Sequence, residues 1–136
     1  MSNRGAILES ALLRRLVARL EKEEHLAASY LLGSAARGDL RPDSDLDIAL
    51  LPARGCVITP QERLSLAADL EDIAGRTVDL GVLSTANLVY AKEAVAHGRV
   101  IFERDHAARA RFAMLVLSMY ASLQECRREV LHAYAA

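Results

Sequence analysis

Two aspartates separated by one residue, Asp45 and Asp47, stand where an apolar run of the chain begins. If this run is a strand, the two carboxylates point to the same side, while Leu46 and Ile48 face the other way. Carboxylates held this close repel each other unless a cation lies between them. Oxygen ligands favour a hard ion such as Mg²⁺ or Mn²⁺, and magnesium takes its other ligands from phosphate and water. The pair therefore predicts a site for a metal-bound nucleoside triphosphate.

A third aspartate, Asp79, lies inside another apolar run, over residues 77–83. A carboxylate in such a run is costly unless it has a function or an ion-pair partner, and a structural salt bridge is the alternative interpretation. If the two runs pair as neighbouring strands, Asp79 joins Asp45 and Asp47. Three carboxylates then suffice for two metal ions about 3.5–4 Å apart, with Asp79 as the candidate general base for an attacking hydroxyl.

The segment before these aspartates offers groups that bind phosphate. Gly33 lets the backbone approach an anion closely, and Ser34 adds a hydroxyl and a backbone N–H at the expected start of a short helix. Arg37 can hold phosphate through two hydrogen bonds, or it can pair with Asp39 or a motif carboxylate instead. These groups meet the aspartates only if the end of one strand and the start of the next share an edge, which predicts an antiparallel pair.

The strands that position these groups are predicted from apolar runs and their stop signals. The first run ends at Gly33, and the second ends at Pro52, which cannot continue a central strand. The predicted strands are 26–32, 46–51, 77–83 and 99–103.

Helices are predicted between these strands from apolar spacing and capping signals. Thr59 and Glu62 form a capping box around Pro60, which suits the first helical position, and Gly75 is a typical residue just past a helix end. The predicted helices are 7–23, 59–74, 84–98 and 105 to near the C-terminus. This alternation indicates an α/β or α+β fold with a small sheet.

The last helix is long for so small a protein. Its apolar stripe has alternating steps of three and four residues, and it consists of Val116, Met119, Leu123, Cys126 and Val130. One interpretation is that the whole stripe packs on the parent sheet, which makes Cys126 a small core residue. The other is that part of it docks a partner helix.

Length and composition favour a single domain over 1–136, with a core of 1–104 and the helix 105–136. The net charge of -1 argues against a broad nucleic-acid-binding face, though it allows a small basic pocket. Cys56 and Cys126 form no CxxC pair, and neither a signal-peptide pattern nor an apolar run of bilayer length is visible. We therefore expect a soluble, cytoplasmic protein without direct nucleic-acid or membrane contacts.

Together these residues resemble a known motif. Gly33-Ser34, ten further residues and Asp45-Leu46-Asp47 resemble the GS-x10-DxD motif of the DNA polymerase β-like nucleotidyltransferase superfamily. The longer pattern GSAARG…SDLDIAL is similar to that of minimal nucleotidyltransferases, specifically the MntA-like antitoxins that pair with HEPN-domain toxins. Asp79 and its strand add a second match with looser spacing.

The resemblance implies a polymerase β palm-like fold, with a mixed sheet flanked by helices. It also implies Mg²⁺, ATP and the transfer of AMP to a tyrosine of a HEPN ribonuclease partner, which silences the toxin. Carried over by motif position, the nucleotide-binding residues are Gly33, Ser34 and Arg37, and the metal-binding and catalytic residues are Asp45, Asp47 and Asp79.

Three alternatives remain at this point. The stretch from Asp43 also resembles the start of an EF-hand loop, but Ile48 and Arg54 stand where that loop needs Gly and Glu. The acceptor could be a small hydroxylated molecule, such as an aminoglycoside. A non-catalytic antitoxin could act by occlusion through the last helix, although occlusion does not require the three aspartates. The base preference of the nucleotide site also stays open.

Overall fold

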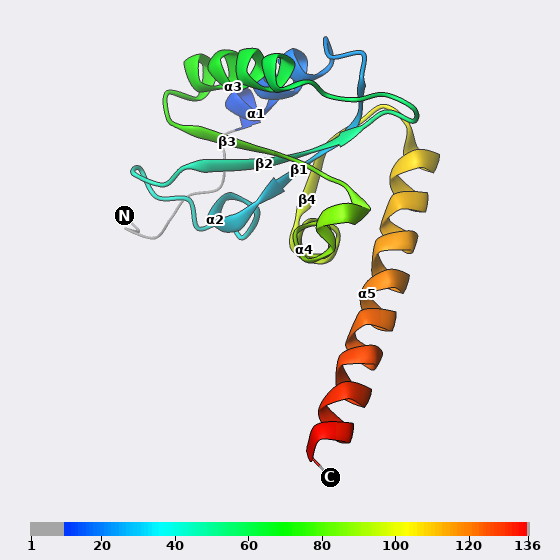
Figure 1. The fold of residues 1–136 in the computed structure, drawn as a ribbon. Helices are drawn as coiled ribbons and strands as arrows, with labels where there is room; N and C mark the ends of the chain where they lie inside the picture. Colours follow the sequence, from blue (N-terminus) through cyan, green and yellow to red (C-terminus); the bar gives the residue numbers. More distant parts are fainter. Residues whose placement is uncertain (1–9, 136) are drawn as a thin grey trace.

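The computed structural model describes residues 10–135 (Figure 1). Its elements are α1 (Ser10–Leu20), β1 (Leu26–Leu32), α2 (Gly33–Ala36), β2 (Leu46–Pro52), α3 (Pro60–Ala74), β3 (Val78–Val82), the 3₁₀ helix η1 (Thr85–Asn87), α4 (Leu88–His97), β4 (Arg99–Glu103) and α5 (His106–Ala135). The four strands and the helices lie where the sequence predicted them, with boundaries shifted by a few residues. The start of the first predicted helix, 7–9, lies outside the described residues.

The strands form one mixed sheet in the order β3-β2-β1-β4. β1 pairs antiparallel with both β2 and β4, whereas β2 and β3 are parallel. The antiparallel pairing of β1 and β2 confirms the expectation that the end of one strand meets the start of the next. The parallel pairing of β2 and β3 likewise brings the starts of these two strands together.

Helices cover both faces of the sheet, because the side chains of β2 alternate between two apolar layers. Ile48 and Leu50 pack among buried leucines of α1 and α3. Ala49 and Leu51 face the other way and pack with α4 and with Val116 of α5. Figure 1 shows α1 and α3 on one side of the sheet and α4 on the other. The α/β fold with a small mixed sheet is therefore confirmed.

The helix ends follow the predicted capping signals. Thr59 Oγ1 accepts a hydrogen bond of 3.1 Å from the Glu62 N–H, and Pro60 is the first helical residue. Gly75 ends α3 with φ 69°, in the left-handed region where glycine is favoured. Asp105 Oδ1 accepts from the Ala108 N–H at 3.0 Å, which caps the start of α5.

The apolar stripe of α5 is mostly exposed, which corrects one interpretation of the sequence. Val116 is its buried member, whereas Val130 is 49% exposed and Cys126 is exposed. The prediction that the whole stripe packs on the parent sheet is therefore wrong, and so is the core role of Cys126. α5 packs on α4, where Lys92 Nζ lies 5.0 Å from the centre of the Tyr120 ring, and its C-terminal half extends away from the sheet (Figure 1).

No helix within residues 10–135 combines the length and the apolar character needed to cross a membrane.

Candidate functional site

The end of β1 and the start of β2 bring the glycine-serine pair against an aspartate. Leu32, the last residue of β1, is the register partner of Asp47, and Gly33 follows directly as the first residue of α2. A Cβ placed at Gly33 would lie 2.8 Å from Asp47 Oδ2. Gly33 also has φ 62°, which other residues rarely adopt. Two independent constraints, backbone conformation and closeness to a carboxylate, therefore require glycine here.

Asp47 and Asp79 are direct neighbours across the sheet. They are register partners in the parallel pair of β2 and β3, so their side chains lie on the same face. Asp79 is exposed and Asp47 is half-buried. Asp45 stands in the loop just before β2 rather than in the strand, and it is exposed. All three carboxylates thus come from the same end of the two parallel strands.

The charge of this group is not neutralised by the protein. Burial raises the pKa of the Asp47 carboxyl, and the negative charges of Asp79 and then Asp45 raise it further. Among residues 10–135, no Lys or Arg side chain forms an ion pair with any of these three aspartates. The salt-bridge alternative for Asp79 is therefore not observed in the described part of the chain. The site has an excess of negative charge that a bound cation would relieve.

The oxygen donors of this site suit magnesium, which needs only a few protein ligands, better than a metal whose ligands must all come from the protein. Within residues 10–135, no three His, Cys, Asp or Glu side chains are grouped so as to hold a metal ion by themselves. Magnesium is usually bound by one or two carboxylates, with phosphate and water completing its shell. The adjacent pair of Asp47 and Asp79 provides such a partial shell.

The raised pKa of Asp47 has a testable consequence. A carboxyl whose pKa is higher in the folded protein than in the unfolded chain binds more protons when folded, so its contribution to stability falls as pH rises above the ordinary value of 3.8. We expect Asp79→Asn to lower the pKa of Asp47, because a neighbouring negative charge is removed. Carboxyl ¹³C NMR titration measures this directly. An unchanged pKa in the variant would show that Asp79 does not act on Asp47.

The phosphate-binding candidates lie next to the acidic pair. Ser34 is half-buried within α2, and Arg37 caps α2 through a backbone hydrogen bond of 3.2 Å to the Gly33 carbonyl. The Arg37 side chain is exposed, and it forms no ion pair with a carboxylate of residues 10–135, Asp39 included. It therefore remains available to an anionic ligand.

A pocket of about 210 Å³ opens beside this segment. It is lined by Leu32, Gly33, Arg37, Glu93, His97 and Gly98. Glu93 and His97 both belong to α4, and His97 is its last residue. No motif marks these two residues, because they enter the site only through the packing of α4 against β1.

Tyr90 is a third residue that the sequence interpretation missed. A Cβ at Gly81 would overlap the hydroxyl and the ring of Tyr90, so the tyrosine of α4 lies directly against β3. Gly81 is two residues after Asp79 and shares its face of the strand. Burial raises the pKa of Tyr90 to about 12, with further contributions from Asp79 and Asp47. A neutral phenol thus lies beside the carboxylates. The sequence indicates it only indirectly, through the glycine at position 81, which leaves room for the Tyr90 ring.

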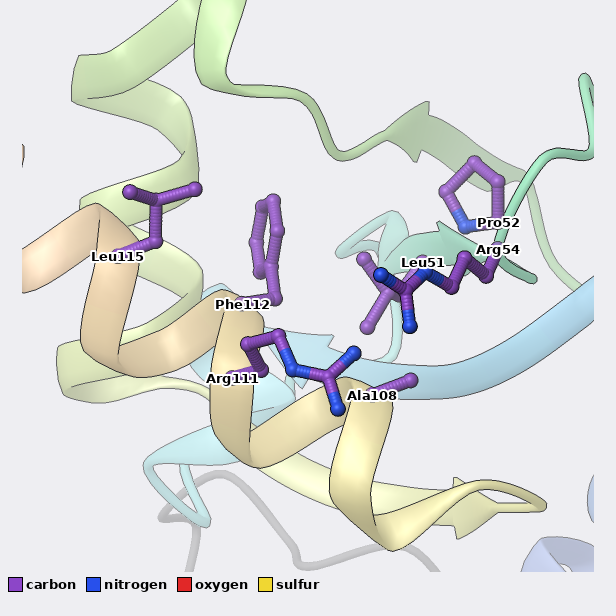
Figure 2. Close-up of a pocket in the computed structure, with 7 residues that line it drawn as sticks. All are labelled: Leu51, Pro52, Arg54, Ala108, Arg111, Phe112 and Leu115. Carbon is purple, nitrogen blue, oxygen red and sulfur yellow. The ribbon is translucent and has the colours of Figure 1, made fainter.

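A separate pocket of about 220 Å³ lies at the other end of β2 and contains none of the predicted site residues. Figure 2 shows Phe112 and Leu115 of α5 on one side and Pro52 on the other, with the side chains of Arg54 and Arg111 extending toward each other between them. Because it lies at the opposite end of the strand from Asp47, it is distinct from the acidic site.

The chain is similar in sequence to a known protein family and to a known protein. Residues 14–107 match the family model described as polymerase beta, nucleotidyltransferase. The chain is 31% identical over 102 residues to the protein adenylyltransferase MntA of Shewanella oneidensis, which covers 75% of this chain and 71% of the relative.

Two solved structures share the fold over nearly the whole chain. One is a crystal structure of a toxin–antitoxin with AMP-PNP, with TM-score 0.73 and 27% identity, covering 95% of this chain and 100% of the other. The second is a crystal structure of the toxin–antitoxin MntA–HepT, with TM-score 0.71 and 25% identity, covering 94% of this chain and 100% of the other.

Proposed function

Because the chain belongs to the polymerase β nucleotidyltransferase family, we propose that it transfers AMP from ATP to a tyrosine of a HEPN-domain toxin and so acts as the antitoxin of a pair. The observation that carries the proposal is the register pairing of Asp47 with Asp79 beside Gly33. Support for the acceptor comes from the relatives, one of which is named a protein adenylyltransferase and others of which were crystallised as toxin–antitoxin structures.

The donor set fits magnesium, which Asp45, Asp47 and Asp79 would hold together with the triphosphate. When bound, magnesium offsets the charge of carboxylates and phosphates and lowers the pKa of a hydroxyl beside it. The excess negative charge around Asp47 is the observation that supports this fit. Two ions are expected, as in other sites where paired carboxylates serve phosphoryl transfer.

The residues of the chain have distinct tasks in this reaction. The backbone at Gly33, the Ser34 hydroxyl and the Arg37 guanidinium bind the phosphates of ATP and orient them toward the carboxylates. Asp79, the exposed member of the adjacent pair, accepts the proton of the acceptor hydroxyl. The acceptor oxygen then bonds to the α-phosphorus, the bond from that phosphorus to the β-phosphate oxygen breaks, and pyrophosphate leaves.

Partner binding has a candidate surface in the exposed part of α5. Leu131 and Tyr134 are 70% and 87% exposed, and both belong to the half of the helix that extends away from the sheet. This surface also keeps the occlusion alternative open as a second way to neutralise a toxin. The two ways of neutralising a toxin differ, because AMP transfer requires the three aspartates and occlusion does not.

Label transfer tests the proposed function. The chain is mixed with Mg²⁺, ATP labelled at the α-phosphate and the purified product of the neighbouring gene. We expect the label on a tyrosine of that partner, and its loss when Mg²⁺ is removed with a chelator. A folded partner that stays unlabelled contradicts the proposal. Labelling of an aminoglycoside in the absence of any protein partner would favour the small-molecule alternative.

A further inference from the structure

β3 has an open edge. It is the strand at one edge of the sheet, next to β2. The residue just before it, Thr77, turns its backbone toward β2, because its carbonyl accepts a hydrogen bond of 2.9 Å from the Leu46 N–H. Residues two apart in a strand turn their backbone groups to the same side, so those of Val78, Leu80 and Val82 point outward. The Val78 N–H already donates to Glu71 Oε1 at 3.2 Å, which leaves the groups of Leu80 and Val82 for another strand. Within residues 10–135, no strand pairs with this edge. Unpaired N–H and C=O groups of this kind are a template for another strand.

A groove runs along the same edge, between β3 and α3. It has a volume of about 360 Å³, and its lining includes Arg63, Leu64 and Ala67 of α3 and Val78, Asp79 and Leu80 of β3. The groove thus contains the residue that we assign as the general base.

Apart from Asp79, the lining of the groove is mostly apolar and carries one positive charge, that of Arg63. Leu64 is 72% exposed although it is a large apolar residue. Arg63 is exposed and forms no ion pair with a residue in 10–135. A ligand that combines apolar side chains with a carboxylate therefore complements these two neighbours, while the open edge of β3 complements a peptide backbone.

We propose that the acceptor segment of the protein substrate binds in this groove as an added β-strand on the open edge of β3. The inference rests on the proposed function and specifies how the acceptor reaches the site. In an added strand, alternate side chains point to opposite faces. The acceptor tyrosine then shares the face of Asp79, and its two neighbours in sequence face α3.

The geometry therefore defines the chemistry of the substrate segment. Residues on both sides of the acceptor tyrosine are apolar, since they contact Leu64 and Ala67. An acidic residue further along the segment meets Arg63. A small hydroxylated acceptor would gain nothing from the open backbone edge or from this apolar contact.

Synthetic peptides test the binding mode on the full chain with Mg²⁺ and labelled ATP. The first probe has a tyrosine between two valines and a glutamate toward one end. The second has the same side chains but N-methylated backbone amides beside the tyrosine, so it cannot form the strand hydrogen bonds. We expect the first peptide to be labelled and the second to lose at least about tenfold in kcat/KM, since tenfold corresponds to about 1.4 kcal/mol, the order of one or two hydrogen bonds.

Variants of α3 test the groove itself, with the toxin partner as substrate. Leu64→Asp and Arg63→Glu are expected to raise the KM for the partner by about tenfold or more and to leave the affinity for Mg²⁺-ATP unchanged. Ser65→Asp is the matched control, because Ser65 is exposed on the same helix but does not line the groove. This control is expected to behave as the unmodified chain.

The outcomes separate this inference from the proposed function. Labelling of the partner with equal KM in all three variants overturns the groove and leaves the transferase function standing. Failure of the chain to bind Mg²⁺-ATP in calorimetry overturns both. If the purified chain is a dimer that Leu64→Asp converts to a monomer, the groove is occupied by a second copy, and the acceptor-strand inference is wrong.

Discussion

Asp47→Asn is expected to lower the rate of AMP transfer by on the order of 10³-fold without unfolding the protein. Asp47 is the carboxylate that both Asp79 and Asp45 influence, and it lies against Gly33, so it joins the acidic and the phosphate-binding sides of the site. Asparagine keeps the shape of the side chain and removes its charge. Initial rates with labelled ATP measure the loss, and thermal unfolding verifies that the variant remains folded.

Asp43→Asn is the matched control for this experiment. Asp43 is an exposed residue in the turn before β2, outside the register pair of β2 and β3. Its replacement is expected to leave the rate within about twofold, because its exposed charge is screened by water and it is not one of the three aspartates assigned to the metal. A folded Asp47→Asn variant that keeps full transfer activity would remove Asp47 from the catalytic site. If instead transfer is lost but the toxin is still fully neutralised, the occlusion alternative is favoured.

Gly33→Ala is expected to lower transfer by about 10²-fold, since a displacement of about 1 Å in a reacting group can have that effect. The new Cβ would lie 2.8 Å from Asp47 Oδ2, so the carboxylate must move. The variant should also lose about 1–2 kcal/mol of stability, because alanine is strained at the φ of 62°. Transfer rates and urea unfolding measure the two effects separately.

Gly55→Ala separates strain from displacement. Gly55 has φ 75°, so alanine there has a similar conformational cost, but its Cβ would meet nothing within 4 Å. We expect a comparable loss of stability with a transfer rate close to that of the unmodified chain. Equal activities of the two variants would mean that the contact between Gly33 and Asp47 has no catalytic importance.

The sequence predicted the elements and the central motif because their signals are local. The apolar runs of β1 and β2, the capping signal at Thr59 and the end of α3 at Gly75 each depend on a few consecutive residues. The meeting of Gly33 and Asp47 also follows from neighbouring elements, since they lie at the two ends of the connection between two consecutive antiparallel strands. The position of Asp79 was predicted only on the condition that its strand lies next to the second one, which the register confirms.

Other features depend on contacts between distant segments. Tyr90 and His97 lie at the site because α4 packs on the sheet, and neither residue is marked by a motif. The stripe on α5 has the spacing of a buried face, yet beyond Val116 it is largely exposed, because an apolar pattern does not specify what covers it.

By itself, therefore, the sequence determined the order of strands and helices, the family motif and the candidate carboxylates, since these follow from short-range backbone preferences and residue spacing. Only the tertiary structure decided that Asp47 and Asp79 are neighbours, that a tyrosine of α4 lies beside them, and that the edge of β3 is open along the groove with α3. Those features arise from long-range packing, in which the burial of apolar faces selects which elements meet.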